Sequence, residues 1–219
     1  MTQLYLVRHG ETDWNAARRI QGSTDIPLNA TGRAQAKRTG RLLASRRWDA
    51  LVSSPLSRAF ETAAIIGGEI GIDDPDRLDA IVERRYGAAE GLDYRTLDER
   101  FPKGVPVPGR ETREAVLARV VPALTALALE RAGQSLVVVT HGGVIRSVLN
   151  AVAPAYPELA GIPITNGSVH SFSYGERGLE LVAFDDPIDF ESVEPGAPDF
   201  DEQNALVARE EGPVAGRGP

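Results

Sequence analysis

Residues 3–10 read Gln-Leu-Tyr-Leu-Val-Arg-His-Gly, a short apolar run that stops at an arginine, a histidine and a glycine. Continuous apolar runs of this length, rich in strand-forming residues, are typical of strands that are buried on both faces of a parallel sheet. We therefore predict a buried strand over residues 3–7, with Arg8 and His9 at its carboxyl end.

The same arrangement of an apolar run followed by polar residues recurs twice along the chain. Residues 49–52 lead into a segment that ends at Arg58, and residues 136–139 lead into His141 and two glycines. Strand signals that alternate with helical patterns predict an α/β fold with a mostly parallel sheet. In such sheets ligands lie beyond the carboxyl ends of the strands, which is where all three polar segments fall.

The remaining pattern predicts helices and a terminal hairpin. Gly67 and Gly68 are expected to stop one helix, and Pro122 is expected to kink or divide another. The expected helices cover residues 31–47, 55–66, 111–132 and a stretch that ends near 152, and the expected hairpin strands cover residues 168–174 and 179–184.

Composition limits the classes of protein to which the chain can belong. Its 219 residues are 42% apolar and 25% charged, which is the composition of an ordinary globular protein that can bury a core. The absence of cysteine excludes disulfides, thiolate zinc sites and cysteine nucleophiles. No signal peptide and no apolar run of membrane-spanning length is recognisable, so we expect a cytoplasmic protein without a membrane partner.

The formal charge of −7 is concentrated at one end of the chain. Residues 185–219 hold ten acidic residues and two arginines, whereas residues 1–184 hold 21 acidic and 22 basic residues. A balanced body gives no support for nucleic-acid binding. We predict a catalytic domain over 1–184 and a flexible, acidic, Pro/Gly-rich tail over 185–219.

Histidine and arginine side chains meet at the predicted strand ends. Only three histidines occur in the chain, and His9 and His141 each end a predicted strand and precede glycine. A single histidine in that position is usually structural, but Arg8 and Arg58 are expected beside this pair. The planar guanidinium group matches phosphate oxygens, and a buried cluster of such groups is costly without an anionic partner. The cluster therefore predicts a phosphate site.

A neutral imidazole next to a bound phosphate is a competent nucleophile. Its attack on phosphorus gives a phosphohistidine that water can hydrolyse, while fixed positive charge neutralises the phosphoryl oxygens. The expected chemistry therefore needs no metal and no other cofactor.

Longer motifs of the chain resemble the histidine phosphatase (phosphoglycerate mutase-like) superfamily. The resemblance covers roughly the first 170 residues and implies a three-layer sandwich, with the mostly parallel central sheet flanked by helices. Its motifs, in the family's order, are Leu-Val-Arg-His-Gly-Glu-Thr-Asp-Trp-Asn at 6–15, Gln-Gly-Ser-Thr-Asp-Ile-Pro-Leu-Asn at 21–29, Ser-Ser-Pro-Leu-Ser-Arg-Ala at 53–59, Glu-Arg-Arg-Tyr-Gly at 83–87 with Glu-Gly at 90–91, and Thr-His-Gly-Gly at 140–143.

The resemblance also implies roles for individual residues. His9 would accept the phosphoryl group, and Glu83 would be the general acid for the leaving oxygen. Without the resemblance, Glu83 would be read as a solvated surface glutamate. The residues expected to line the phosphate pocket are Arg8, Arg58 and His141, and those expected to bind substrate are Asn15, Gln21, Gly22, Arg84, Tyr86 and Gly142. The third histidine, His170, matches no catalytic position and is expected to be structural.

The family contains both phosphatases and mutases. Only 57 residues separate Glu83 from His141, and the second histidine is followed by two glycines, both of which favour a phosphatase. We therefore predict a phosphomonoesterase for small phosphorylated metabolites. Arg84 and Tyr86 are closer to the mutase pattern, so a bisphosphoglycerate-dependent phosphoglycerate mutase stays an alternative. Arg110 stands where relatives usually have glycine, and it either approaches the pocket mouth or only opens the following helix.

A non-catalytic phospho-ligand-binding module is the alternative from another class. The complete set of expected catalytic residues argues against it. The natural substrate is open at this point, and so is a homodimer.

Overall fold

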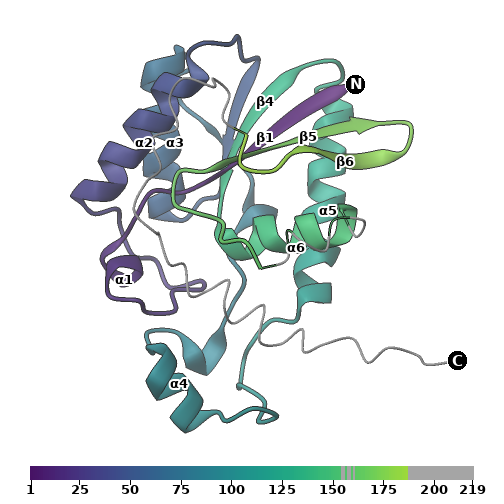
Figure 1. The fold of residues 1–219 in the computed structure, drawn as a ribbon. Helices are drawn as coiled ribbons and strands as arrows, with labels where there is room; N and C mark the ends of the chain where they lie inside the picture. Colours follow the sequence, from purple (N-terminus) through teal and green to yellow (C-terminus); the bar gives the residue numbers. More distant parts are fainter. Residues whose placement is uncertain (154–155, 157–158, 160, 187–219) are drawn as a thin grey trace, which may run out of the picture.

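The computed structural model describes residues 1–153, 156, 159 and 161–186. A six-stranded sheet lies at the centre, in the order β3-β2-β4-β1-β5-β6 (Figure 1). The strands β3, β2, β4 and β1 pair parallel to one another, β5 pairs antiparallel with β1, and β6 pairs antiparallel with β5. The strands are β1 (Thr2–Arg8), β2 (Ala50–Ser53), β3 (Asp76–Arg77), β4 (Ser135–Thr140), β5 (Val169–Gly175) and β6 (Gly178–Ala183).

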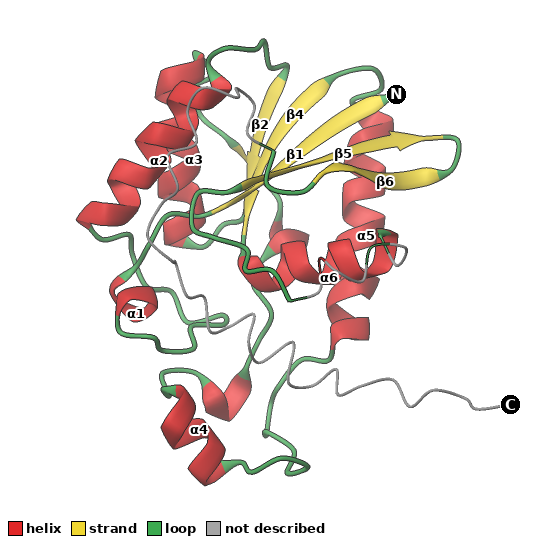
Figure 2. Cartoon of the chain, in the orientation of Figure 1, coloured by secondary structure: helices red, strands yellow, loops and turns green. Residues whose placement is uncertain are grey.

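Helices cover both faces of this sheet (Figure 2). Side chains alternate along β1, so that Leu4 and Leu6 pack on one face and Tyr5 and Val7 on the other. The first face is covered by α5 (Arg113–Glu130) and α6 (Gly142–Val152), and the second by α2 (Ala30–Leu43) and α3 (Ser57–Ile70). The predicted three-layer α/β sandwich with a mostly parallel sheet is therefore confirmed.

The predicted end of one helix was wrong. The helix α3 does not stop at Gly67 and Gly68 but continues to Ile70 and ends at Gly71, whose φ of 75° is the left-handed conformation. Gly67 allows the backbone at Ile72 to pack closely against α3, because a Cβ on Gly67 would lie 2.3 Å from the carbonyl oxygen of Ile72.

The long helix α5 is a single helix that contains Pro122 in its exposed face. Its buried residues recur every four positions and pack against the sheet, which outweighs the hydrogen bond that proline removes. These residues are Val116, Val120, Leu124 and Ala128.

A smaller substructure lies beyond the carboxyl ends of the parallel strands, around α1 (Asp13–Ala16) and α4 (Tyr94–Arg100) (Figure 1). The sequence pattern did not predict these short helices. Ile20, Tyr86 and Leu97 belong to a separate apolar cluster there.

The predicted acidic tail lies almost entirely outside the described residues, which end at Asp186. Backbone N–H groups of Asp185 and Asp186 still donate to His170 Nδ1 and to the Val169 carbonyl of β5. Among the described residues, no helix combines the length and the apolar character that crossing a membrane requires.

Candidate active site

The structure brings the expected phosphate-pocket residues together at the carboxyl ends of the strands. His9 follows β1, His141 follows β4, and Arg58 lies in the first turn of α3, which follows β2. Arg8, Arg58 and Glu83 are each only 1% exposed. The rings of the two histidines lie edge to face, with centroids 5.1 Å apart.

One hydrogen bond fixes the tautomer of His9. Its Nδ1 lies 2.7 Å from the carbonyl oxygen of Gly10, and since a carbonyl only accepts, Nδ1 carries the proton. The lone pair is therefore on Nε2, which accepts a hydrogen bond of 3.2 Å from Arg58 Nε. Burial, followed by the charges of Arg58 and Arg8, holds the pKa of His9 well below its usual value. The His9 ring is thus a neutral base, and the lone pair of its Nε2 faces the guanidinium group of Arg58.

Carbonyl oxygens orient the two arginines. Arg58 donates from its terminal nitrogens to the carbonyls of Gly22 (2.7 Å) and Thr24 (2.9 Å), and Arg8 donates to that of Ile164 (2.7 Å). Burial lowers the pKa of Arg58 to about 10, so it still carries a positive charge at neutral pH. Two buried guanidinium groups thus face the His9 side of the site.

His141 has one satisfied and one unsatisfied ring nitrogen. Its Nε2 lies 2.8 Å from Ser54 Oγ, whereas its Nδ1 is buried without a hydrogen-bond partner among the described residues. Burial, with the nearby Arg58 as the next cause, lowers the pKa of His141 well below the usual value. In the tautomer in which the Ser54 hydroxyl donates to Nε2, the Nδ1–H of His141 can donate a hydrogen bond to an anionic oxygen.

Glu83 is a buried carboxyl held by two backbone donors. The N–H of Arg84 donates to one oxygen (2.7 Å) and the N–H of Gly143 to the other (3.1 Å). Burial raises the pKa of Glu83 and outweighs these hydrogen bonds and the charges of Arg58 and Arg8. A carboxyl whose neutral form is favoured can donate a proton, as a general acid must.

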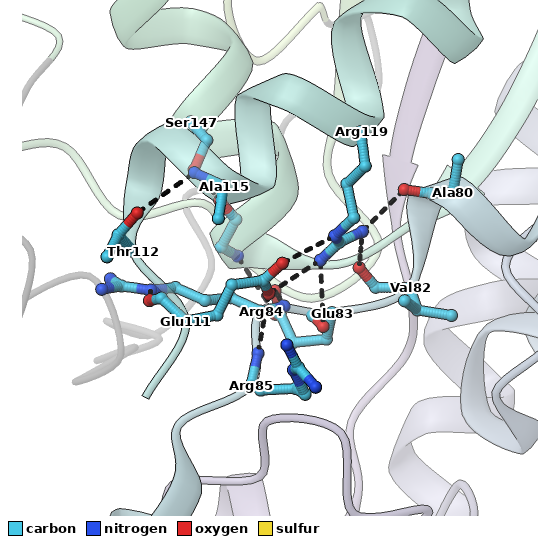
Figure 3. A network of polar contacts seen from close by, with 11 residues as sticks. Ala80, Val82, Glu83, Arg84, Arg85, Glu111, Thr112, Ala115, Arg119 and Ser147 are labelled. Carbon is cyan, nitrogen blue, oxygen red and sulfur yellow. Dashed lines mark hydrogen bonds and ion pairs between the residues drawn. The ribbon is translucent and has the colours of Figure 1, made fainter. Parts of the chain in front are cut away.

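A network that sequence reasoning missed positions the segment that carries Glu83 (Figure 3). Arg119 of α5 donates to the carbonyls of Ala80 (2.6 Å) and Val82 (2.8 Å) and pairs with Glu111 at 2.9 Å. The N–H of Glu111 in turn donates to the carbonyl of Arg85 (2.8 Å). Nothing in the spacing of these residues could have indicated the network, because it joins Arg119 of α5 to Val82, which lies 37 residues away in the sequence.

The second missed residue is Glu90, which closes the loop that Arg58 contacts. Its carboxylate accepts hydrogen bonds from the backbone N–H groups of Ser23 (3.1 Å), Thr24 (2.9 Å) and Tyr86 (2.9 Å). Gly22, with a φ of 57°, lies so close that a Cβ would be 2.2 Å from this carboxylate. Glu90 therefore fixes the backbone conformation of the loop that contains Gly22, Ser23 and Thr24.

Gln21 begins this loop and lies beside the site. It is 1% exposed, and both polar atoms of its amide are buried without a hydrogen-bond partner among the described residues. A buried amide in this state is costly, so the site favours a polar ligand here. Gly142, also buried, is the first residue of α6 and supplies one of the backbone N–H groups at that helix start.

Asn15 takes part in a capping box rather than standing free. Its Oδ1 accepts from the N–H of Thr12 (3.2 Å) and lies 3.4 Å from Nδ2 of Asn166. Asn166, a further residue that sequence reasoning missed, donates from the same Nδ2 to the carbonyl of His9 (2.9 Å).

His170 lies apart from the pocket on β5. Its Nε2 contacts Ser168 Oγ at 2.9 Å, and its Nδ1 accepts from the N–H of Asp185 (3.1 Å). Burial, with Arg146 as the next cause, lowers the pKa of His170 to about 3, so the ring stays neutral.

Arg84 and Tyr86 lie side by side next to Glu83. Arg84 is 5% exposed, its Nε donates to the carbonyl of Glu111 (2.7 Å), and its guanidinium carbon lies 5.4 Å from the centre of the Tyr86 ring. Within the described part of the chain, histidine, aspartate and glutamate side chains form no group of three or more that could hold a metal ion.

Comparison with known proteins places this geometry in a family. The model of the histidine phosphatase superfamily (branch 1) matches residues 4–187. The chain belongs to the histidine phosphatase superfamily. Membership of this family identifies the protein as an enzyme, as its sequence motifs predicted.

The relatives include proteins named for both chemistries. PhoE of Bacillus subtilis, an uncharacterized phosphatase, is 37% identical over 81% of this chain and 91% of its own length. A metal-independent phosphoserine phosphatase of Arabidopsis thaliana is 34% identical over 71% and 70% of the two chains. A probable phosphoglycerate mutase, GpmB of Salmonella choleraesuis, is 32% identical over 80% and 86%.

Solved structures agree with this assignment. A mycobacterial glucosyl-3-phosphoglycerate phosphatase, determined in complex with VO3, superposes with a TM-score of 0.74 at 27% identity. The match covers 83% of this chain and 98% of that one.

Proposed function

We propose that this enzyme is a metal-independent phosphomonoesterase that hydrolyses small phosphorylated metabolites through a phosphohistidine at His9. The observation that carries the proposal is the neutral His9 ring, whose Nε2 lone pair is fixed by the hydrogen bond from Nδ1 to Gly10 and faces Arg58. The family match over 4–187 supports assigning the catalytic domain to residues 1–184.

The first half of the reaction transfers the phosphoryl group to the enzyme. The phosphate oxygens bind Arg8, Arg58 and Nδ1 of His141. The two arginines supply fixed positive charge, and the histidine nitrogen supplies a buried hydrogen-bond donor. The lone pair of His9 Nε2 forms a bond to phosphorus as the bond from phosphorus to the leaving oxygen breaks. The protonated carboxyl of Glu83 gives its proton to that oxygen, so the product leaves as an alcohol.

The second half returns the enzyme to its starting state. The Glu83 carboxylate now takes a proton from a water molecule, whose oxygen attacks the phosphohistidine. The bond between nitrogen and phosphorus breaks, the electron pair returns to His9 Nε2, and inorganic phosphate is released. Glu83 is protonated again and ready for the next cycle.

A bisphosphoglycerate-dependent phosphoglycerate mutase is the second candidate. Arg84 and Tyr86 beside the acid favour it, because they could bind the carboxylate of phosphoglycerate. Relatives named as probable mutases point the same way. A phospho-ligand-binding module without turnover is disfavoured by the complete and mutually oriented set of reactive side chains.

The test is phosphate release in the presence of EDTA from p-nitrophenyl phosphate and a panel of natural monoesters. We expect hydrolysis by the wild type, no phosphoenzyme with His9→Ala, and competitive inhibition by vanadate. His170→Ala is the matched control, since it removes a buried histidine outside the pocket and should still form the phosphoenzyme. Loss of activity on chelation would contradict the metal-free mechanism.

The same assay separates the alternatives. Interconversion of 3- and 2-phosphoglycerate after priming with the bisphosphate, without net hydrolysis, would assign the protein to the mutases. Neither hydrolysis nor interconversion, with retained binding of phosphate esters, would support the binding module.

A further inference from the structure

The ring of His141 has one nitrogen to which the fold gives no hydrogen-bond partner. The side chain is completely buried, its Nε2 lies 2.8 Å from Ser54 Oγ, and its Nδ1 has no partner among the described residues. Burial holds the pKa of His141 well below its usual value, so the ring is neutral and has one donor and one acceptor nitrogen. The kind of ligand atom that Nδ1 can bind therefore depends on which nitrogen carries the proton.

The hydroxyl of Ser54 has two contacts, and only one of them can take its proton. The backbone N–H of Leu56 lies 3.4 Å from Ser54 Oγ and can only donate to it. The other contact is His141 Nε2, and no further hydrogen bond of this hydroxyl is found in the described part of the chain. Ser54 is completely buried, so its hydroxyl does not reach bulk solvent. The hydroxyl is satisfied only if it donates to Nε2, which places the ring proton of His141 on Nδ1.

A second contact between a serine and a histidine in this chain has the opposite direction. Ser168 Oγ donates its proton to the carbonyl of Thr165 (2.7 Å), so it can only accept from His170 Nε2 (2.9 Å). The Nδ1 of His170 accepts from the N–H of Asp185 (3.1 Å), which agrees with a proton on Nε2. The two serine hydroxyls therefore select opposite tautomers, Nε2–H in His170 and Nδ1–H in His141.

The position of His141 at the start of α6 agrees with a protonated Nδ1. A side-chain acceptor at an N-cap normally binds one of the first N–H groups of its helix. His141 is the N-cap residue of α6, yet its side chain makes no capping hydrogen bond. The N–H of Gly143, in the first turn, donates instead to Glu83 (3.1 Å). An Nδ1 that carries a proton cannot cap the helix, but it can donate to an anionic oxygen in the pocket.

We propose that Ser54 is a positioning residue, which fixes His141 in the Nδ1–H tautomer and thereby makes it a neutral hydrogen-bond donor to the transferred phosphoryl group. The inference rests on the proposed phosphatase function and adds to it a residue that acts only through His141. The backbone holds Ser54 in place, because its N–H donates to the carbonyl of Val139 (2.9 Å) and its carbonyl accepts from Ser53 Oγ (2.9 Å). Donors that are oriented before the substrate binds stabilise the transition state without further reorganisation.

NMR of the protein labelled with nitrogen-15 at histidine tests the tautomer directly and needs no turnover. The chain has only three histidines, and the other two serve as references, with the proton of His9 on Nδ1 and that of His170 on Nε2. The variants His9→Ala and His170→Ala assign the signals. We expect the pattern of His141 in the wild type to be that of the Nδ1–H tautomer. An Nε2–H pattern for His141 in the wild type would overturn the proposal.

Ser54→Ala removes the hydroxyl and keeps both backbone hydrogen bonds of this residue. We expect the His141 signals to lose the pure Nδ1–H pattern. The affinity for vanadate, and kcat/KM for p-nitrophenyl phosphate, should each fall about tenfold or more, as expected for the loss of a hydrogen bond to a charged group. Ser54→Thr keeps a hydroxyl and should retain the wild-type tautomer and most of the affinity. The wild-type spectrum decides the tautomer even if neither variant folds.

Ser171→Ala is the matched control, because it removes another buried serine hydroxyl, on β5 and outside the pocket. It should leave both the His141 pattern and the affinity for vanadate unchanged. A folded Ser54→Ala variant that keeps the pure Nδ1–H pattern would overturn the positioning role even if its activity falls. The reason is that a serine with a merely structural role would lower activity without moving the ring proton.

Failure of this inference is distinguishable from failure of the proposed function. A wild type that hydrolyses p-nitrophenyl phosphate, but whose His141 is in the Nε2–H form, sinks the role of Ser54 and leaves the phosphatase standing. A wild type that hydrolyses no phosphate ester, but whose Nδ1–H pattern and vanadate affinity depend on Ser54, supports the positioning role and contradicts the phosphatase.

Discussion

Replacing Gly143 by alanine tests whether Glu83 acts as the general acid, because it displaces the carboxyl group without changing its chemistry. The added Cβ would lie 2.6 Å from a carboxyl oxygen of Glu83, which has to retreat to at least 3.4 Å. A misplacement of about 0.8 Å in a catalytic group costs on the order of 10- to 100-fold in rate. The loss should fall on substrates that need the leaving oxygen to be protonated.

The assay compares an alkyl phosphate with p-nitrophenyl phosphate, whose leaving group departs readily without a proton. We expect kcat on the alkyl ester to fall about 10- to 100-fold, and kcat on the nitrophenyl ester to change less than about threefold. Gly68→Ala is the control, because no atom lies within 4 Å of the new Cβ and the change stabilises α3 by about 0.5–1 kcal/mol. An unchanged rate on the alkyl ester, or equal losses on both esters in a folded variant, would refute the acid role.

Three other predictions concern pH, stability and positioning. Because burial lowers the pKa of His9, His9 should be neutral down to a pH well below 6.5, and because burial raises the pKa of Glu83, the fall of kcat/KM with rising pH should lie above the usual glutamate pKa of 4.5. Glu83→Gln should abolish this fall and lower kcat/KM, as pH–rate profiles would show. Arg119→Ala removes the ion pair of Glu111 and the hydrogen bonds to the carbonyls of Ala80 and Val82, and it should cost about 2–3 kcal/mol, a fall in Tm of roughly 5–10 °C by calorimetry. An unchanged Tm would show that the network does not stabilise the fold. Asn166→Ala frees the His9 carbonyl and should lower kcat about tenfold at unchanged KM, measured by steady-state kinetics; a change in KM alone would argue against a positioning role.

The mostly parallel character of the sheet and the location of the candidate site could be predicted from the sequence to a large extent. A run such as residues 3–7 can be satisfied only by burial on both faces, and the polar residues that follow such runs must meet at one edge of the sheet. For this reason the positions of His9, Arg58 and His141 could be anticipated from local pattern and motif resemblance.

Helix ends and short helices were less predictable, because tertiary contacts decide them. Gly67 reads as a stop signal, yet it lies inside α3 so that the helix can approach the carbonyl of Ile72. Pro122 predicts a kink or a division, yet α5 is not divided there, because its buried side packs against the sheet along its whole length. Such contacts join residues that the local pattern does not connect.

The sequence by itself determined which side chains are present and that they gather where the strands end. Only the tertiary structure decided their chemical states and positions: which nitrogen of His9 carries the proton, that burial raises the pKa of the Glu83 carboxyl, and how Arg119 and Glu90 hold the surrounding loops. The reason is that a protonation state depends on burial and on partners a few ångströms away. Those partners come from segments far apart in the chain, and folding alone brings them together.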